Sequence, residues 1–333
     1  MKVTIKDVAK EANVATSTVS RVLSNNPRIS EETKERVNAA IKKLNYKPNP
    51  IARSLANNKT RILGVVLPNE ADVLLANPFF INAMKGMSMY AQSKNYYITY
   101  AFSKNEETEA ENIKEMTNSH LVDGVILLRV RENDESVKYL KEINFPFVVV
   151  GRPECPDEVL WVDNNNFQAM YKVVNKLIQN GHKKIGFVGA IKNLNMSKDR
   201  FKGYKKALEM NGIKYDENLV IHKDEFKEYA GKISCEELLE NNDLTAIVTT
   251  DDLIAFGVMN ELNNRKIKNI AVVGFNNTQL AQYQKPPLAS VDINADKLGY
   301  QATKLLINAL EGNDDDNRHY IVNTEFIERK SFI

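Results

Sequence analysis

Residues 245–275 of the chain read TAIVTTDDLIAFGVMNELNNRKIKNIAVVGF. Two apolar runs, TAIVTT at 245–250 and NIAVVGF at 269–275, enclose a stretch long enough for a helix, which Thr250 and Asp251 are well placed to begin. Continuous apolar runs joined by helical segments are typical of parallel sheets that are covered on both faces. The stretch therefore predicts one unit of a doubly wound α/β fold.

The same alternation occupies the chain from Arg61 onward. Six further apolar runs follow the pattern: ILGVVLP (62–68), YYITYAF (96–102), DGVILL (123–128), FPFVVVG (145–151), KKIGFVG (183–189) and NLVIH (218–222). A body of this length with about ten strands favours two parallel-sheet subdomains over one. We expect a body at 62–333, with one subdomain at roughly 62–161 plus 293–319 and the other at 162–290 plus 320–333.

The composition excludes several classes of protein. The 333 residues are 43% apolar and 26% charged, which rules out collagen-like, disordered and disulfide-stapled chains. Cys155 and Cys235 form no CxxC pair, so we expect a reducing compartment and no Cys-based metal site. Neither a cofactor nor another metal site is expected from the motifs. The sequence shows no apolar segment typical of a secretory leader or a membrane span, and a cytoplasmic location is expected.

Positive charge is concentrated at the start of the chain. Residues 1–61 carry 13 Lys/Arg and 5 Asp/Glu, whereas the whole chain has a net charge of only +2. A basic segment on a mildly acidic body indicates a polyanionic partner for that segment. A solvated basic helical surface is the simpler alternative that charge alone leaves open.

The basic segment has the pattern of a helix-turn-helix domain. Ile5, Val8 and Ala12 recur at helical spacing after a capping Thr4, and a second amphipathic stretch runs from Thr16 to Leu23. A third helix is expected from Ser30 to about Leu44. The pattern therefore predicts an all-α DNA-binding domain at 1–45, followed by a hinge with a short helix at 46–61.

Several motifs resemble those of the LacI/GalR family of bacterial repressors. They are TIKDVAKEANVATSTVSRVL (4–23), YKPN (46–49), ARSLA (52–56), NPFF (77–80), SKDRFKGY (197–204), TTDDLIAFGVM (249–259), VVGFNN (272–277) and PPLASVDIN (286–294). The phrases VVGRP (149–153), VDNNN (162–166) and NMSKDR (195–200) look most like maltose-operon repressors of Gram-positive bacteria. The resemblance implies a homodimeric transcriptional repressor that binds palindromic operator DNA under the control of a small sugar.

The resemblance also assigns residues to DNA contacts. The helix that starts near Thr16 can enter the major groove, where hydroxyl and guanidinium groups meet base edges and phosphates. The base-reading candidates are Thr16, Ser17 and Arg21, the phosphate candidates are Thr4, Thr18 and Ser20, and the hinge candidates are Asn49, Ala52, Arg53 and Leu55, with Leu55 as a minor-groove wedge. One departure is Ala15, which stands where the family usually has a Ser or Thr cap.

In the body, the resemblance implies a sugar site between the subdomains. The candidates are Arg200, Asp251, Asn276 and the stacking aromatic Phe226, with Phe79, Asp163 and Ser197 as weaker ones. Many relatives carry Asp at the position of Asn276, and some have Asp where Gly151-Arg152-Pro153 stands here. The cleft should therefore be roomier and suit maltose or another α-glucoside.

Other functions are weaker alternatives. A sugar-processing enzyme would use Asp251 and Asp252 as paired carboxylates and His182 as a base, but the sequence has no nucleophile elbow, P-loop or metal-spaced His pair. A plain solute-binding protein would have no need of the basic segment at residues 1–61. A global regulator with a phosphorylated carrier protein as corepressor stays open, as does the direction in which ligand changes DNA affinity.

Overall fold

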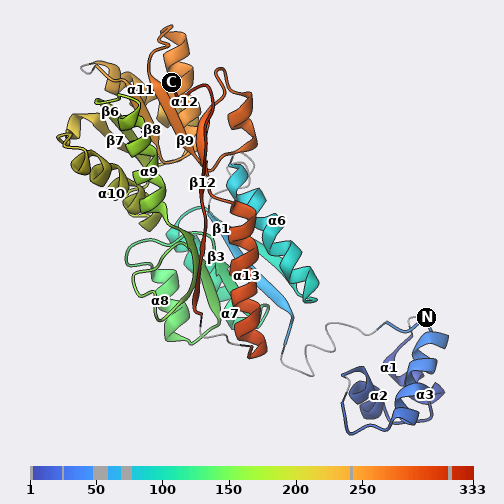
Figure 1. Ribbon diagram of the computed structural model, residues 1–333. Helices are drawn as coiled ribbons and strands as arrows, with labels where there is room; N and C mark the ends of the chain where they lie inside the picture. Colours follow the sequence, from blue (N-terminus) through green and yellow to red (C-terminus); the bar gives the residue numbers. More distant parts are fainter. Residues whose placement is uncertain (1–2, 25, 48–58, 69–76, 241–242, 314–316) are drawn as a thin grey trace. The chain divides into compact units, whose positions relative to one another are not determined.

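The computed structural model describes residues 3–24, 26–47, 59–68, 77–240, 243–313 and 317–333. The chain forms two compact units, Met1–Thr60 and Arg61–Ile333. We call them the head and the body and describe each by itself (Figure 1). The hinge candidates Asn49, Ala52, Arg53 and Leu55 lie outside the described residues, so their expected roles stay predictions.

The described residues of the head form three helices around a small apolar core. Its helices are α1 (Ile5–Glu11), α2 (Thr16–Leu23) and α3 (Glu31–Lys43). Each helix contributes a fully buried valine to this core: Val8, Val19 and Val37. The hydrophobic spacing of the sequence therefore places one face of every helix inward, as amphipathic helices require.

The three helices of the head begin differently. At α1, the backbone N–H and the hydroxyl of Thr4 both donate to the Asp7 carboxylate, at 2.8 and 2.7 Å. At α3, the Ser30 hydroxyl accepts from the backbone N–H of Thr33. Ala15 precedes α2 and offers no side-chain acceptor, so α2 starts without a side-chain cap.

The described residues of the body form two six-stranded sheets. The first has the order β11-β5-β4-β3-β1-β2 and is parallel throughout, and the second has the order β12-β10-β9-β8-β6-β7, with β12 antiparallel. The strands are β1 (Ile62–Pro68), β2 (Tyr97–Ser103), β3 (Gly124–Leu127), β4 (Phe147–Val150), β5 (Leu160–Asn164), β6 (Ile185–Ala190), β7 (Val220–Lys223), β8 (Ala246–Thr249), β9 (Ala271–Phe275), β10 (Ala289–Asp292), β11 (His319–Val322) and β12 (Glu325–Ile327). The predicted doubly wound α/β class is confirmed.

Helices cover both faces of each sheet. They are α6 (Pro78–Ser93), α7 (Glu106–Asn118), α8 (Glu135–Glu142), α9 (Asn166–Gln179), α10 (Asn195–Met210), α11 (Glu228–Glu240), α12 (Asp252–Asn264) and α13 (Ala295–Glu311), with short 3-10 turns at Glu217–Leu219 and Gln279–Tyr283. On the first sheet α6 and α13 pack opposite α7 and α8, and on the second α9 and α10 pack opposite α11 and α12. We call each sheet with its helices a lobe.

Glycines allow α6 and α13 to pack very closely. A Cβ atom at Gly86 would lie 1.8 Å from the backbone oxygen of Asp296, and one at Gly299 would lie 2.0 Å from that of Ala83. Such distances leave no room for any side chain, so the backbones touch directly. This close pair packs against the first sheet (Figure 1).

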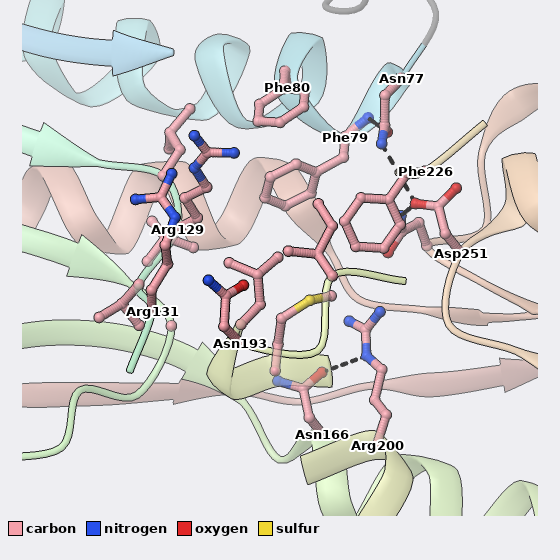
Figure 2. A pocket seen from close by; sticks show the side chains of 18 of the residues that line it. Asn77, Phe79, Phe80, Arg129, Arg131, Asn166, Asn193, Arg200, Phe226 and Asp251 are labelled. Atoms are coloured by element: carbon pink, nitrogen blue, oxygen red, sulfur yellow. Dashed lines mark hydrogen bonds between the residues drawn. The ribbon is translucent and has the colours of Figure 1, made fainter. Parts of the chain in front are cut away.

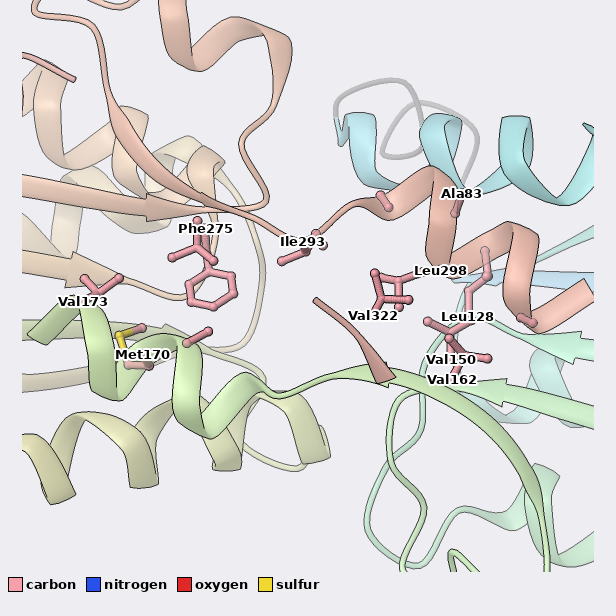
Figure 3. Close-up of a cluster of buried hydrophobic side chains, with 14 of the residues drawn as sticks. Ala83, Leu128, Val150, Val162, Met170, Val173, Phe275, Ile293, Leu298 and Val322 are labelled. Atoms are coloured by element: carbon pink, nitrogen blue, oxygen red, sulfur yellow. The ribbon is translucent and has the colours of Figure 1, made fainter. Parts of the chain in front are cut away.

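The backbone crosses between the lobes three times, and one side chain connects all three crossings. Asn164, at the end of β5, donates from Nδ2 to the backbone oxygens of Ile293 (3.0 Å) and Val322 (2.9 Å). A continuous apolar cluster runs beneath them, from Phe275 in the second lobe past Ile293 to Leu298 in the first (Figure 3). The three crossings are therefore held side by side.

The crossings lie a few residues later than the sequence suggested. Boundaries at 161 and 319 fall inside β5 and at the start of β11, and both strands belong to the first sheet. β11 pairs with β5 along Trp161–Asn164, so residues 319–322 belong to the first lobe and not to the second. Apolar patterning marks a strand but not the sheet that it joins, which explains the shift.

Candidate functional site

A cavity of about 630 Å³ lies between the two lobes of the body. Its walls come from segments that follow the carboxyl ends of strands in both sheets, the usual ligand position in open α/β folds. The lining includes Asn77, Phe79, Phe80, Arg129, Arg131, Asp163, Asn166, Ile191, Asn193, Arg200, Phe226, Asp251 and Asn276. A cavity of this size suits a small organic ligand.

Arg200 on α10 is a buried donor in this cavity (Figure 2). Its Nε donates to Asn166 Oδ1 at 2.9 Å, and its Nη1 donates to the backbone oxygen of Thr250 at 2.6 Å. The guanidinium carbon lies 3.7 Å from the centre of the Phe275 ring. Burial lowers the pKa of Arg200 to about 10, so the side chain is a fixed cation at neutral pH.

Asp251 is both a helix cap and a cavity acceptor. Its Oδ1 accepts from the backbone N–H of Leu253 at 2.7 Å, which begins α12. Its Oδ2 accepts from Asn276 Nδ2 at 2.7 Å and from Asn77 Nδ2 at 3.4 Å, the latter across the cleft (Figure 2). Burial, followed by repulsion from Asp252, raises the pKa of Asp251 to about 7.

Asp163, at the end of β5, is a second buried carboxylate. It accepts backbone N–H groups from Asn164 at 2.7 Å and Arg152 at 3.0 Å, and Asn166 Nδ2 at 2.9 Å. Burial raises the pKa of Asp163 to about 6 despite these donors. Asn166 thereby connects the Asp163 carboxylate to Arg200, and the three side chains form one polar network.

Aromatic side chains supply the apolar surface of the cavity. Phe79 and Phe80 come from the first turn of α6, with ring centres 5.1 Å apart, and Phe226 follows β7 in the second lobe. Figure 2 shows Phe79 and Phe226 between two polar ends of the cavity. Forked donors and acceptors beside aromatic rings are the arrangement that binds adjacent sugar hydroxyls and the apolar face of a ring.

Two lining residues have strained backbones. Ile191 has φ +47° and Asn276 has φ +100°, and both follow strands of the second lobe. Positive φ is rare for a β-branched residue in particular, and such strain is typical of binding sites. The strain therefore agrees with a ligand site at these strand ends.

The structure brings most of the predicted sugar-site residues together. The cavity lining contains Phe79, Asp163, Arg200, Phe226, Asp251 and Asn276. Ser197 is not part of that lining, because its hydroxyl is buried and donates to the backbone oxygen of Ala190 at 2.8 Å. We therefore leave Ser197 out of the site.

The residues considered for an enzyme do not form a catalytic group. Asp252 turns away from Asp251 and accepts from Ser290 Oγ and the Thr278 backbone N–H, both at 2.6 Å. His182 Nε2 instead lies 2.8 Å from the backbone oxygen of Ile333. Asp251 and Asp252 thus have separate surroundings.

Sequence reasoning missed a charged end of the cavity. Arg129 Nη2 and Arg131 Nη2 both lie 3.1 Å from Glu109 Oε2, and Arg131 Nε lies 3.0 Å from Glu106 Oε1. Asn77 and Asn166 were also missed. Their positions in the sequence were the available signals. Asn166 lies in the VDNNN phrase, Asn77 begins NPFF, and Arg129 directly follows the DGVILL run, with Arg131 two residues later.

In the head, α2 presents a polar outer face. Thr16, Ser17, Ser20 and Arg21 are exposed and Thr18 is half-buried, while Val19 and Val22 face the core. Thr4 is exposed as well, with its hydroxyl bonded to Asp7. The face carries the hydroxyl and guanidinium groups that read base edges and grip phosphates.

The described residues offer neither a membrane-spanning helix nor a metal-binding cluster. None of the helices within those ranges is long and apolar enough to cross a membrane. No group of three or more His, Cys, Asp or Glu side chains there could hold a metal ion.

The head has a polar second helix, and the body has two lobes with a buried polar and aromatic cavity between them. Together these features define a ligand-responsive DNA-binding protein. The family model "Bacterial regulatory proteins, lacI family" matches residues 4–49, and the "Periplasmic binding protein-like domain" model matches residues 174–332. The HTH-type transcriptional regulator MalR of Streptococcus pneumoniae is 38% identical over 335 residues, which cover 99% of each chain.

Two solved structures have the same architecture. The transcriptional regulator CelR–cellobiose complex matches with a TM-score of 0.77 and 27% identity, over 99% of this chain and 100% of that one. A probable maltose operon transcriptional repressor from Staphylococcus matches with a TM-score of 0.75 and 26% identity, over 83% of this chain and 99% of that one. The chain belongs to the lacI family of bacterial regulatory proteins; it is a DNA-binding, sugar-responsive transcriptional repressor and not an enzyme.

Proposed function

We propose that maltose or another α-glucoside binds in the cavity between the lobes and releases the repressor from its operator. The observation that carries the proposal is the buried network of Arg200, Asn166 and Asp163 beside Asp251, with Phe79 and Phe226 against it. This network offers donors and acceptors to adjacent hydroxyl groups. The likeness to MalR over the whole chain supports an α-glucoside as the sugar.

The sugar would act by fixing the angle between the lobes. Asp251 of the second lobe already contacts Asn77 of the first at 3.4 Å, and a ligand that binds both would favour one closure angle. The three crossings near Asn164 would serve as the hinge. A ligand changes DNA affinity only as far as it prefers one arrangement, so closure is the step to measure.

On the DNA side, the proposal is a homodimer on a palindromic operator. Thr16, Ser17 and Arg21 would contact bases, while Thr18 and Ser20 would contact phosphates. One head offers few base contacts, and two heads related by a twofold axis match a palindrome of two half-sites. Ala15 in place of a hydroxyl cap removes one polar group from this surface.

Thermal unfolding of the full chain with single sugars tests the ligand class. Maltose at about 100 times its dissociation constant should stabilise the body by about 2.7 kcal/mol, whereas lactose and ribose should not. Stabilisation by none of the α-glucosides would contradict the proposal. Operator binding that responds only to a phosphorylated carrier protein would favour the global-regulator alternative instead.

A further inference from the structure

We propose that Arg129 forms a second sugar subsite, where its guanidinium donates to hydroxyl oxygens of the second ring of a neutral disaccharide or longer oligosaccharide. The inference rests on the proposed function and names the length of the sugar. Arg129 follows β3 and lines the same cavity as Arg200 and Asp251. Figure 2 shows the two polar ends of the cavity, with the Phe79 and Phe226 rings between them.

The hydrogen bonds of Arg129 are incomplete. Its Nη2 pairs with Glu109 Oε2 at 3.1 Å, but its Nε is buried and has no hydrogen-bond partner among the described residues. Nearly all buried donors in proteins are paired, so an unpaired one beside a cavity indicates a missing acceptor. A hydroxyl oxygen of a bound sugar would supply that acceptor.

Arg131 differs from Arg129 because protein groups already hold it in place. Its guanidinium contacts Glu106, Glu109 and Asp134, and its backbone N–H donates to Asp134 Oδ2 at 3.1 Å. Glu109 contacts both arginines and is itself buried. Arg131 and Glu109 are therefore positioning residues that fix Arg129 at the cavity wall.

The charges around this end favour a neutral ligand over a sugar phosphate. Three carboxylates, those of Glu106, Glu109 and Asp134, offset the positive charges of Arg129, Arg131 and the cavity-lining Lys104. At the opposite end, three buried carboxylates, those of Asp163, Asp251 and Asp252, act on the charge of Arg200. Neither end has the excess of positive charge that a phosphate group would require.

The subsite also lies where the lobes touch. The backbone N–H of Glu132 donates to the Asn193 oxygen at 3.0 Å, and that of Asn195 donates to the Val130 oxygen at 3.3 Å. A ring bound at Arg129 would therefore contact the segment of the first lobe that meets the second. A longer sugar would bind to both ends of the cleft, whereas a single ring at Arg200 would reach one.

Calorimetry of the full chain with glucose, maltose, maltotriose and glucose 6-phosphate tests the subsite. For the unaltered protein we expect tighter binding of maltose and maltotriose than of glucose. Arg129→Gln should weaken maltose binding at least about tenfold and change glucose binding less than about twofold. Arg129→Lys retains the charge near Glu109 but lacks the Nε donor, so its maltose affinity should lie between those of the unaltered protein and Arg129→Gln. This intermediate affinity would also show that the variant is folded.

Arg318→Gln is the matched control, because the exposed Arg318 donates from Nη1 to the Glu158 backbone oxygen and is not part of the cavity lining. It should bind every sugar as the unaltered protein does. Equal losses of maltose and glucose in Arg129→Gln, or no loss of maltose, would overturn the subsite alone. An Arg129-dependent preference for glucose 6-phosphate would assign an anion site instead. If the unaltered protein binds none of these sugars, the proposed function fails as well.

Discussion

At the scale of single residues, the cavity contains ionisable side chains whose burial disfavours their charged forms. Asp251 has its pKa raised to about 7 and Asp163 to about 6, mainly by desolvation. The cation of Arg200 lies close enough to favour both carboxylates, but it does not offset the burial. A ligand that brings hydroxyl donors to these acceptors would offset part of that cost.

The raised pKa of Asp251 makes the stability of the body depend on pH. The folded chain retains the Asp251 proton up to about pH 7, whereas an unfolded chain loses it near pH 4. Asp251 therefore contributes most stability below pH 4, and this contribution is lost as the pH rises to 7. The free energy of unfolding of the wild type minus that of Asp251→Asn should fall between pH 5 and 8, by at most about 1.4 kcal/mol per unit.

Urea unfolding of both proteins in buffers of pH 5 to 8 measures this difference. The exposed Asp157 provides the control, since Asp157→Asn should leave the pH profile of the wild type unchanged. Parallel profiles for the wild type and Asp251→Asn would show that the pKa of Asp251 is the same in the folded and the unfolded chain.

Arg200 should be irreplaceable even by lysine. Arg200 donates to Asn166 and Thr250 at once, in two directions that a single ammonium group does not reproduce. Arg200→Lys should reduce maltose affinity at least about tenfold, a loss of about 1.4 kcal/mol, in calorimetry. Arg265→Lys, a change at a half-exposed ion pair with Glu261, should retain the affinity. An unchanged affinity in Arg200→Lys would remove the guanidinium fork from the sugar site.

At the scale of elements, α2 in the head begins without a side-chain cap, although the backbone geometry at Ala15 would allow one. Ala15 has φ −71° and ψ 153°, the extended conformation typical of a capping residue. Ala15→Ser should stabilise the head by about 1 kcal/mol, which slows exchange of the Val19 and Val22 amides about fivefold. Hydrogen exchange of the full chain measures this. Unchanged protection in α2 would mean that the serine hydroxyl does not cap the helix.

The crossings between the lobes depend on Asn164. Asn164→Leu would leave the Ile293 and Val322 oxygens without their donor at a buried position, and we expect a loss of about 2 to 5 kcal/mol in stability. Urea unfolding measures the loss. Asn263→Leu removes one exposed side-chain bond, to the Lys285 oxygen, and should cost less than about 1 kcal/mol. Similar losses in both variants would refute a special role of Asn164.

Periodicity predicted the elements of the chain better than their connections. Apolar runs such as KKIGFVG became central strands because a strand buried on both faces must be apolar along its length. β11 and β12 were less visible, because HYIV is largely exposed and EFI is short. Likewise, family motifs indicated Arg200 and Asp251, but no motif indicated Arg129, whose role depends on Glu109 twenty residues earlier.

At the scale of the whole molecule, the concentration of positive charge in the first 61 residues predicts strongly salt-dependent DNA binding. A dimer that neutralises six or more phosphates should lose at least about 10³ in operator affinity between 50 and 200 mM salt. Fluorescence anisotropy with the DNA upstream of the gene measures this slope, and sedimentation at micromolar concentration measures the mass. A monomer, or affinity indifferent to salt, would contradict the proposed dimer.

Sugar and operator should weaken each other's binding by the same factor. If maltose lowers operator affinity tenfold, it must prefer the DNA-free arrangement of the lobes by about 1.4 kcal/mol. Thermodynamic linkage then requires operator DNA to lower maltose affinity tenfold, although the residues proposed to bind sugar all lie in the body. Calorimetry of maltose binding with and without saturating operator measures one factor, and anisotropy of operator binding with and without maltose measures the other. Equal factors above one establish the cleft as the switch. Identical maltose affinities in the presence and absence of operator would mean that sugar closes the lobes without any effect on the head.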